Sequence, residues 1–149
     1  MRMPVLLAAL APVIFAAGCG SPPSIVQARL SRTTIFSDQS TRVNVTVNDK
    51  NGLDDIVGAH LYSGDRTYWF GSFYEVSDGV FEYVIDWPTL NDHQPIYFDF
   101  PIARPFVVVV EDNEGEVDEV AIQVNLSCRA GDHACDGACY PVDVDCADV

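Results

Sequence analysis

Four cysteines lie in an apolar-poor segment of the 149-residue sequence, separated by six, three and six residues: Cys128, Cys135, Cys139 and Cys146. Thiols at this density form disulfides or bind zinc. Zinc sites built from thiolates usually contain two Cys-x2-Cys pairs. Neither pair is present in this segment. His133 could replace one of the cysteines as a zinc ligand, but the spacing still favours two disulfides over a zinc site. Disulfides also stabilise a segment that cannot build its own core. Three pairings are possible, and the spacing does not choose between them.

Two turns concentrate carboxylate and amide side chains, whose oxygens are the ligands that calcium prefers. The candidate ligands are Asp49 and Asn51 in the first turn, where Asp54 and Asp55 follow, and Asp112 and Glu114 in the second. The spacing does not fit an EF-hand loop. Placing the glycine of either turn at the sixth loop position puts a valine at the first ligand position. Asp and Asn also form Asx-turns, so the pattern favours turn-forming residues with solvated carboxylates over a calcium site.

Three histidines, His60, His93 and His133, are the candidate general bases for catalysis, and none lies in a nucleophile motif. The sequence has no Gly-x-Ser-x-Gly, His-Glu-x-x-His, Walker loop or Gly-x-Gly-x-x-Gly pattern. Carboxylates are abundant enough for a glycosidase-like pair, but a sandwich of about 100 residues leaves little wall for a deep cleft. The sequence therefore predicts a protein that is not an enzyme and that has no cofactor and no nucleotide ligand.

Aromatic residues are concentrated between Tyr62 and Phe100, and Tyr68, Trp69 and Phe70 are consecutive. Neighbouring side chains of a strand point to opposite faces, so either Trp69 or the two rings beside it must face away from the core. We expect the outward rings to be covered by the loop 86–95 or by the cysteine-rich segment. The alternative is an exposed platform for stacking on sugars or docking a protein. The candidate platform residues are Tyr68, Trp69, Tyr74 and Trp87.

The elements that position these residues are predicted to be strands, because apolar residues of the middle segment alternate with period two. In Thr41–Asn48 three valines alternate with Asn and Thr, and Val117–Leu126 repeats the pattern. Turn-forming Asp, Asn, Ser and Gly separate the segments. We predict strands at Ile25–Leu30, Thr41–Asn48, Ile56–Tyr62, Tyr68–Phe73, Val80–Ile85, Ile96–Phe100, Phe106–Glu111 and Val117–Leu126. Short strands at this spacing indicate an all-β sandwich or barrel.

Two stretches of the middle segment resemble bacterial immunoglobulin-like repeats. Val43–Leu61, with its Val-x-Val-x-Val strand and Asp-Lys-Asn-Gly turn, resembles their second and third strands. Phe106–Leu126, with its Asp-Asn-Glu-Gly turn and long return strand, resembles their closing hairpin. The resemblance implies an immunoglobulin-like antiparallel β-sandwich of about seven to eight strands, followed by a small disulfide-rich tail. It implies a fold and no activity.

A charged start, Met1–Met3, precedes an apolar run over residues 5–17, which is shorter than the about 20 residues that span a bilayer. The small residues Ala16–Gly18 then precede Cys19. This arrangement resembles the lipobox of bacterial lipoproteins, with Ala16 at the position where that family usually has Leu. The resemblance implies that Cys19 is lipidated and becomes the first mature residue. The alternative is an ordinary signal-peptidase cut that leaves Cys19 as a free thiol.

Gly20 follows the cysteine at a position where inner-membrane retention often uses Asp, so the resemblance implies an outer-membrane lipoprotein on either the periplasmic or the cell-surface face. Ser21–Ser24 contains two prolines and is predicted to be a short, stiff tether. Removing residues 1–18 removes Arg2 and no acidic residue, so the formal net charge changes from -14 to -15. The acidic character therefore belongs to the exported part of the chain.

The tail pattern of Gly131, Cys135-x-Gly137-x-Cys139 and Asp145-Cys146 resembles a cysteine-rich motif in exported lipoproteins of myxobacteria, which implies a cell-envelope location. We divide the chain into a signal peptide (1–18), a tether (19–24), a sandwich (25–127) and a cysteine-rich tail (128–149).

The charge balance of 22 acidic and 8 basic side chains disfavours nucleic acid as a partner, because such a surface repels phosphate. We predict a secreted, non-catalytic envelope lipoprotein with a structural or binding module. Its expected partners are the membrane, through the lipid anchor, and an envelope protein or polysaccharide. The alternative is a carbohydrate-binding or adhesion module that uses the aromatic platform. A calcium-stabilised domain or a small hydrolase is less favoured.

Overall fold

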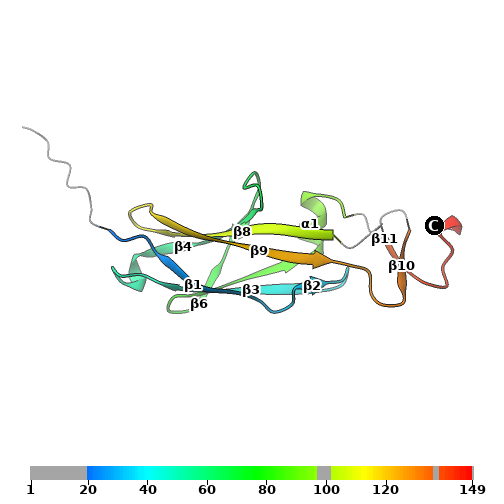
Figure 1. The fold of residues 1–149 in the computed structure, drawn as a ribbon, viewed down its shortest axis with the longest axis horizontal. Coiled ribbons are helices and arrows are strands. Elements are labelled where there is room, and N and C mark those ends of the chain that lie inside the picture. The colour runs from blue at the N-terminus through cyan, green and yellow to red at the C-terminus, as the bar shows by residue number, and fades with distance from the viewer. Residues whose placement is uncertain (1–19, 97–101, 136–137, 149) are drawn as a thin grey trace, which may run out of the picture.

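The computed structural model describes residues 20–96, 102–135 and 138–148. Two β-sheets pack face to face, and a small hairpin segment follows them (Figure 1). The elements are β1 (Ser24–Leu30), β2 (Thr34–Ile35), β3 (Ser40–Asn48), the 3-10 turn η1 (Leu53–Asp55), β4 (Ile56–Ser63), β5 (Trp69–Ser72), β6 (Tyr74–Ser77), β7 (Val80–Asp86), α1 (Trp87–His93), β8 (Ile102–Asp112), β9 (Val117–Leu126), β10 (Asp132–Cys135), β11 (Ala138–Pro141) and the 3-10 turn η2 (Cys146–Asp148). The predicted all-β, immunoglobulin-like sandwich with a small disulfide-rich tail is confirmed.

The first sheet has the strand order β1-β3-β7-β6, and all its pairs are antiparallel. The centre of this sheet is β3, whose Val43, Val45 and Val47 are buried while the residues between them are less buried. Because side chains alternate along a strand, the sequence pattern alone decides which face of β3 meets the core. The period-two prediction for this strand is confirmed.

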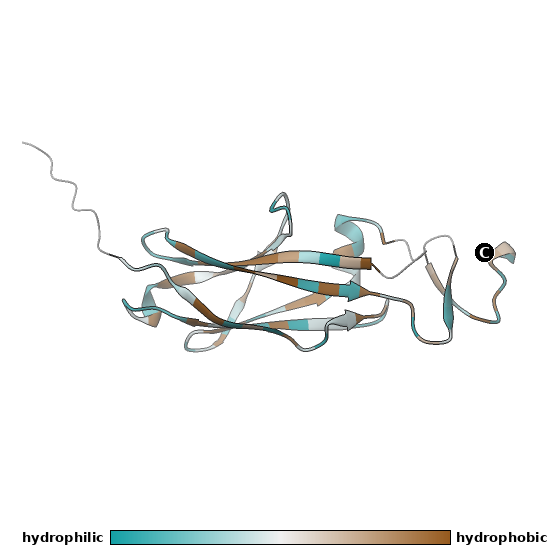
Figure 2. Cartoon of the chain, in the orientation of Figure 1, coloured by the Kyte–Doolittle hydropathy of each residue, from teal (hydrophilic) through white to brown (hydrophobic). Residues whose placement is uncertain are grey.

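The second sheet has the order β2-β9-β8-β4-β5, and its one parallel pair is the short β2 against β9. Phe106, Val108 and Val110 of β8 are buried, as are Val124 and Leu126 at the end of β9. Apolar and polar residues alternate toward the end of β9 (Figure 2), whereas residues 106–110 of β8 are all apolar and only their burial alternates. Inward side chains of both sheets form one buried cluster, and each fully buried branched side chain stabilises the fold by about 1.5–3 kcal/mol.

A helix replaces part of the predicted loop 86–95. Asp86 caps α1 by accepting a hydrogen bond from the Thr89 N–H (2.9 Å), and Pro88 lies in the first turn, where a missing N–H costs nothing. Leu90 of α1 is buried in the core cluster. The helix therefore closes one end of the sandwich.

The other differences from the predicted strands occur at edges. The described part of the sandwich has nine strands instead of seven to eight, because β2 and β6 were not predicted. Both are short edge strands, and all four residues of β6 are exposed, so neither has an alternating apolar pattern. The predicted strand Ile96–Phe100 lies outside the described residues except for Ile96, which is buried and belongs to no strand.

The tail forms the hairpin β10–β11, held by two disulfides, Cys128–Cys139 and Cys135–Cys146. Of the three pairings open to the sequence, this is the interleaved one, first to third and second to fourth. Cys128 and Cys139 pack against the core cluster, so the hairpin touches the sandwich. An ion pair between Arg129 of the tail and Asp38 of the sandwich adds a second connection.

The two ends of the sandwich carry different features (Figure 1). The described chain enters at Gly20 beside the loop between β3 and β4 and the turn between β8 and β9. The tail and α1 lie at the opposite end. No helix among the described residues is long and apolar enough to cross a membrane.

Candidate functional site

The two acidic turns meet at the end of the sandwich where the chain enters. Asp49 directly follows β3, and Asp112 is the last residue of β8. The start of β4 lies between them, because Ile56 pairs with Asp112. Both carboxylates are withdrawn from solvent, with Asp49 8% and Asp112 1% exposed. The two turns therefore form one site, in which buried carboxylates from distant parts of the sequence face each other.

Each of these carboxylates uses one oxygen to shape its own turn. Asp49 Oδ1 accepts a hydrogen bond from the Asn51 N–H (2.6 Å), which makes the Asx-turn that the sequence predicts. Asp112 Oδ1 accepts from the N–H groups of Glu114 (3.0 Å) and Glu116 (2.7 Å). The second oxygen of each carboxylate, Oδ2, is buried and has no hydrogen-bond partner.

A third carboxylate, Asp55 of η1, completes the group. Its side chain accepts hydrogen bonds from the amides of Asn113 (3.0 Å) and Asn51 (3.4 Å), and the Asn113 bond is the main reason that the pKa of Asp55 is lowered. Each of the three aspartates offers one carboxylate oxygen, and these oxygens of Asp49, Asp55 and Asp112 lie within 4.8 Å of one another. The sequence placed Asp55 in the first turn but did not select it as a ligand, because only the fold brings η1 against the end of β8.

Glu114 and Asn51 lie at the exposed rim of this group. A hydrogen bond to Asp55 raises the pKa of Glu114, because a proton on Glu114 relieves the repulsion between the two carboxylates. Of the four calcium candidates, Asp49 and Asp112 are thus central, and Asn51 and Glu114 are peripheral. We call Asp49, Asp55 and Asp112 the carboxylate triad.

The four candidate platform aromatics do not share a surface. Trp69 pairs with Tyr62 on the outer face of the second sheet and is 56% exposed. Tyr74 pairs with Glu82 on the outer face of the first sheet and is 51% exposed. Phe70, between them, turns inward and packs its ring against Phe106. Exposed aromatic surface is present, as strand alternation requires, but it is divided between the two sheets.

Residues of the predicted loop 86–95 contact Tyr68, but the cover expected for the outward rings does not extend to Trp69 or Tyr74, which are exposed. Tyr68 stacks on His93 of α1 with ring centroids 4.0 Å apart, although it stays partly exposed. Trp87 begins α1 at the tail end of the sandwich, where it packs against the core cluster. These two residues therefore belong to packing around the helix.

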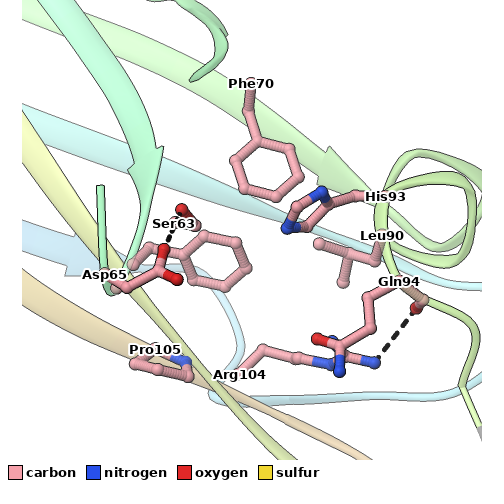
Figure 3. Close-up of a pocket in the computed structure, with 10 residues that line it drawn as sticks. Ser63, Asp65, Phe70, Leu90, His93, Gln94, Arg104 and Pro105 are labelled. Atoms are coloured by element: carbon pink, nitrogen blue, oxygen red, sulfur yellow. Dashed lines mark hydrogen bonds between the residues drawn. The ribbon is translucent and has the colours of Figure 1, made fainter. Parts of the chain in front are cut away.

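A pocket of about 220 Å³ lies between α1 and the edge of the second sheet (Figure 3). Apolar residues line much of it, and His93, Gln94, Arg104 and Asp65 add polar groups. The volume is below the roughly 300–1,000 Å³ of typical small-molecule sites. The sequence did not predict this pocket, because it depends on where α1 lies.

The charged groups of the pocket are already engaged in structure. The Arg104 guanidinium donates to the carbonyls of Gln94 (3.1 Å) and Pro95 (3.2 Å), and burial lowers its pKa. Asp65 accepts hydrogen bonds from the Ser63 hydroxyl and from the Thr67 N–H and hydroxyl, which lower its pKa to about 2. Arg104 thus fixes the chain after α1, and Asp65 fixes a loop. Neither is poised for catalysis.

A serine–histidine pair occurs on the outer face of the second sheet, where His60 Nδ1 and Ser72 Oγ are 3.0 Å apart. Within the described residues, no carboxylate accepts a hydrogen bond from His60, and neither residue lines the pocket. The third member of a catalytic triad is therefore missing from the described part of the chain. The pair connects the neighbouring strands β4 and β5.

His133 lies beside Cys135 and Cys146, the arrangement that a zinc site would need. Both sulfurs are joined in a disulfide, however, and a disulfide sulfur is not the thiolate that ligates zinc. The tail cysteines are therefore structural. Cys19, the predicted lipidation site, lies outside the described residues.

No protein-family model matches the sequence, and no curated protein matches it. Among solved structures, the chain is similar to the crystal structure of the PKD1 domain of Vibrio anguillarum Epp, with a TM-score of 0.45 and 10% sequence identity. The match covers 74% of this chain and 99% of that chain.

Proposed function

We propose that this chain is an exported lipoprotein of the cell envelope that acts as a non-catalytic structural or binding module. The observation that carries the proposal is the pairing of all four tail cysteines with one another. Because the sequence has five cysteines, Cys19 is left without a disulfide partner in its own chain. A free thiol is a liability in an oxidising compartment, and lipidation at the lipobox-like sequence would consume it.

Two further observations support this function. Paired cysteines in a small, core-poor segment are typical of proteins outside the cytoplasm. The described chain enters at one end of the sandwich and the disulfide-bonded tail lies at the other (Figure 1). A sandwich anchored through Cys19 would therefore hold the tail away from the membrane, which suits a module that presents a surface to an envelope protein or polysaccharide.

Replacing Cys19 with Ser is expected to move the protein from the membrane fraction to the soluble periplasmic fraction, because a serine at this position cannot form the thioether to a lipid. A Ser21→Ala variant, which changes a neighbouring hydroxyl and leaves Cys19 intact, serves as the control and should stay in the membrane fraction. The measurement is fractionation followed by density separation of inner and outer membranes. Equal membrane association of the Cys19→Ser variant and the parent would contradict the proposed anchor.

A second candidate function is carbohydrate binding or adhesion, which the exposure of Trp69 favours. Trp69 and Tyr62 are cross-strand neighbours on the outer face of the second sheet, and Val107 lies beside Tyr62 on the next strand. A flat apolar surface of this kind is suited to stacking on a sugar ring. The platform is therefore smaller than the sequence suggested, with Trp69 on the edge strand β5 and Tyr62 beside it.

Replacing Trp69 with Ala tests this second function, because a surface side chain removed from a binding platform lowers affinity while stability changes by no more than about 0.5 kcal/mol. Tyr74→Ala is the matched control, since Tyr74 is a similarly exposed aromatic on the other sheet. We expect binding to isolated envelope polysaccharide to weaken about thirtyfold for Trp69→Ala, as for a hot-spot residue, and to persist for the control. Equal binding by both variants would rule this candidate out.

A further inference from the structure

The carboxylate triad contains two buried oxygens that nothing in the described chain satisfies. Asp112 Oδ2 and Asp49 Oδ2 have no hydrogen-bond donor, although their residues are 1% and 8% exposed. Burying a carboxylate oxygen without a partner is costly, and such groups in native proteins usually mark an ion, a water or a functional strain. The ion pairs found among the described residues all lie elsewhere, at Arg42–Glu82, Arg66–Glu119 and Arg129–Asp38.

The spacing of the triad fits a single cation of calcium's size. Calcium binds oxygens at about 2.3–2.6 Å, so two oxygens on one ion can be at most about 5 Å apart. The ligand oxygens of Asp49, Asp55 and Asp112 lie within 4.8 Å of one another, inside this limit. Three carboxylates this close carry a formal charge of -3, and their mutual repulsion is relieved by a divalent cation.

We propose that Asp49, Asp55 and Asp112 form a calcium site that joins the loop between β3 and β4 to the turn between β8 and β9. The site differs from an EF-hand, because its ligands come from separate strand ends and not from one continuous loop. This explains why the spacing of each turn, taken alone, argues against calcium. Asx-turn formation and metal binding do not compete here, since the turns use Oδ1 of Asp49 and Asp112 and leave Oδ2 for the ion.

The donor set selects calcium over other metals. All three central ligands are carboxylates, whereas zinc prefers thiolate and imidazole ligands. Magnesium demands near-ideal octahedral geometry at shorter distances and usually keeps several waters, which suits a buried triad poorly. Glu114 supplies a fourth carboxylate at the exposed rim, two residues after Asp112, whose Oδ1 accepts a hydrogen bond from the Glu114 N–H (3.0 Å). Extracellular calcium modules work at roughly 10⁻⁴–10⁻³ M, so we expect an affinity in that range.

Calcium at this position would also act on the segment from residue 20 to residue 25. A Cβ added to Gly20 would lie 3.3 Å from Glu114 Cγ and 3.4 Å from Glu116 Oε2, so the chain passes directly over the turn that carries the ligands. The Ile25 N–H donates to Asp118 Oδ2 (2.7 Å) just beyond that turn. Fixing the turn between β8 and β9 would therefore also fix residues 20–25 where they pass over it.

The test is a comparison of thermal melting in a chelator, in millimolar calcium and in millimolar magnesium, using the full exported chain. A site that binds only the folded state raises the melting temperature, and about 1 mM calcium at the expected affinity should raise it by about 2–6 °C. Magnesium should raise it less. Isothermal titration with calcium chloride should give one bound ion per chain.

Asp112→Asn separates metal binding from a purely structural role. The variant keeps a carbonyl oxygen for the Glu114 and Glu116 N–H groups but replaces the unpartnered carboxylate oxygen with an uncharged NH2 group, which is not a calcium ligand. We expect it to melt at or above the wild-type temperature in chelator and to gain almost nothing from calcium, with affinity lowered at least about tenfold. Asp49→Asn should behave in the same way.

Asp54→Asn is the matched control, because Asp54 is an exposed aspartate of the same loop outside the triad. It should respond to calcium like the wild type. Two results would overturn the proposal: a wild-type melting temperature that does not change with calcium, or equal calcium responses in Asp112→Asn and Asp54→Asn. If Asp112→Asn fails to fold, the Asp49→Asn variant and the wild-type titration decide the question.

Discussion

Replacing Phe106 with Ala is expected to lower the free energy of unfolding by about 3–5 kcal/mol, a large part of the roughly 5–15 kcal/mol that holds such a domain together. Phe106 is 2% exposed and belongs to the core cluster, and its ring packs against Phe70 with centroids 5.4 Å apart. It also lines the pocket beside α1. The substitution would therefore remove a ring from the contact between β8, β5 and the helix.

The control for this substitution is Val107→Ala on the same strand. Val107 faces outward and is only half-buried, so its truncation should cost less than about 1 kcal/mol. Urea denaturation followed by circular dichroism measures both variants. Equal destabilisation by the two substitutions would contradict the inward and outward assignment of β8 and, with it, the packing of the second sheet.

The second large effect is expected from removing one disulfide of the tail. A Cys128→Ala, Cys139→Ala double variant should unfold the tail hairpin, because a cross-link over a loop of about this size contributes roughly 3 kcal/mol and the tail has little apolar area to replace it. Amide hydrogen exchange is the measurement. Protection in β10 and β11 should fall to that of an unfolded chain, while β3 and β9 keep theirs.

The matching variant is Cys135→Ala with Cys146→Ala, which removes the other cross-link of equal span. It should also release η2, which begins at Cys146. Persistent protection of the hairpin in both variants would show that its own hydrogen bonds suffice. Loss of protection in β3 and β9 as well would contradict a local effect of the disulfides on the tail.

Period-two patterning predicted the central strands because each has one face in the core and one toward solvent. The predicted Val117–Leu126 has the same bounds as β9, and β3 begins one residue earlier than predicted. For these strands the alternating pattern in the sequence is enough to predict the strand and its inward face, because the burial of alternate residues is what stabilises them. The immunoglobulin-like sandwich could therefore be predicted from the sequence.

The sequence did not predict the elements that form only because a neighbouring element packs against them or pairs with them. The pair of residues Thr34–Ile35 forms β2 because β9 offers a free edge beside it. The helix α1 has only seven residues, too few to show a helical period, although Asp86 before Pro88 and Thr89 is a recognisable start signal. The capping pattern is therefore the local sequence signal for this helix.

The candidate sites also combine features that the sequence shows with features that only the folded chain creates. Each acidic turn was visible in the sequence, but the carboxylate triad exists only because β4 and β8 are paired in a register that places Ile56 opposite Asp112. Likewise, the four candidate aromatics looked like one cluster along the chain. The crossing from β5 to β6 places Trp69 and Tyr74 on different sheets. Side chains that share a turn could be predicted, and contacts across the fold could not.

The most direct measurement of the central claim, an exported and lipid-anchored module, is mass spectrometry of the protein extracted from membranes. We predict that the first residue is Cys19 carrying a lipid modification. The four tail cysteines should resist alkylation until they are reduced. A chain that begins at another residue, with Cys19 removed or present as an alkylatable thiol, would contradict the account.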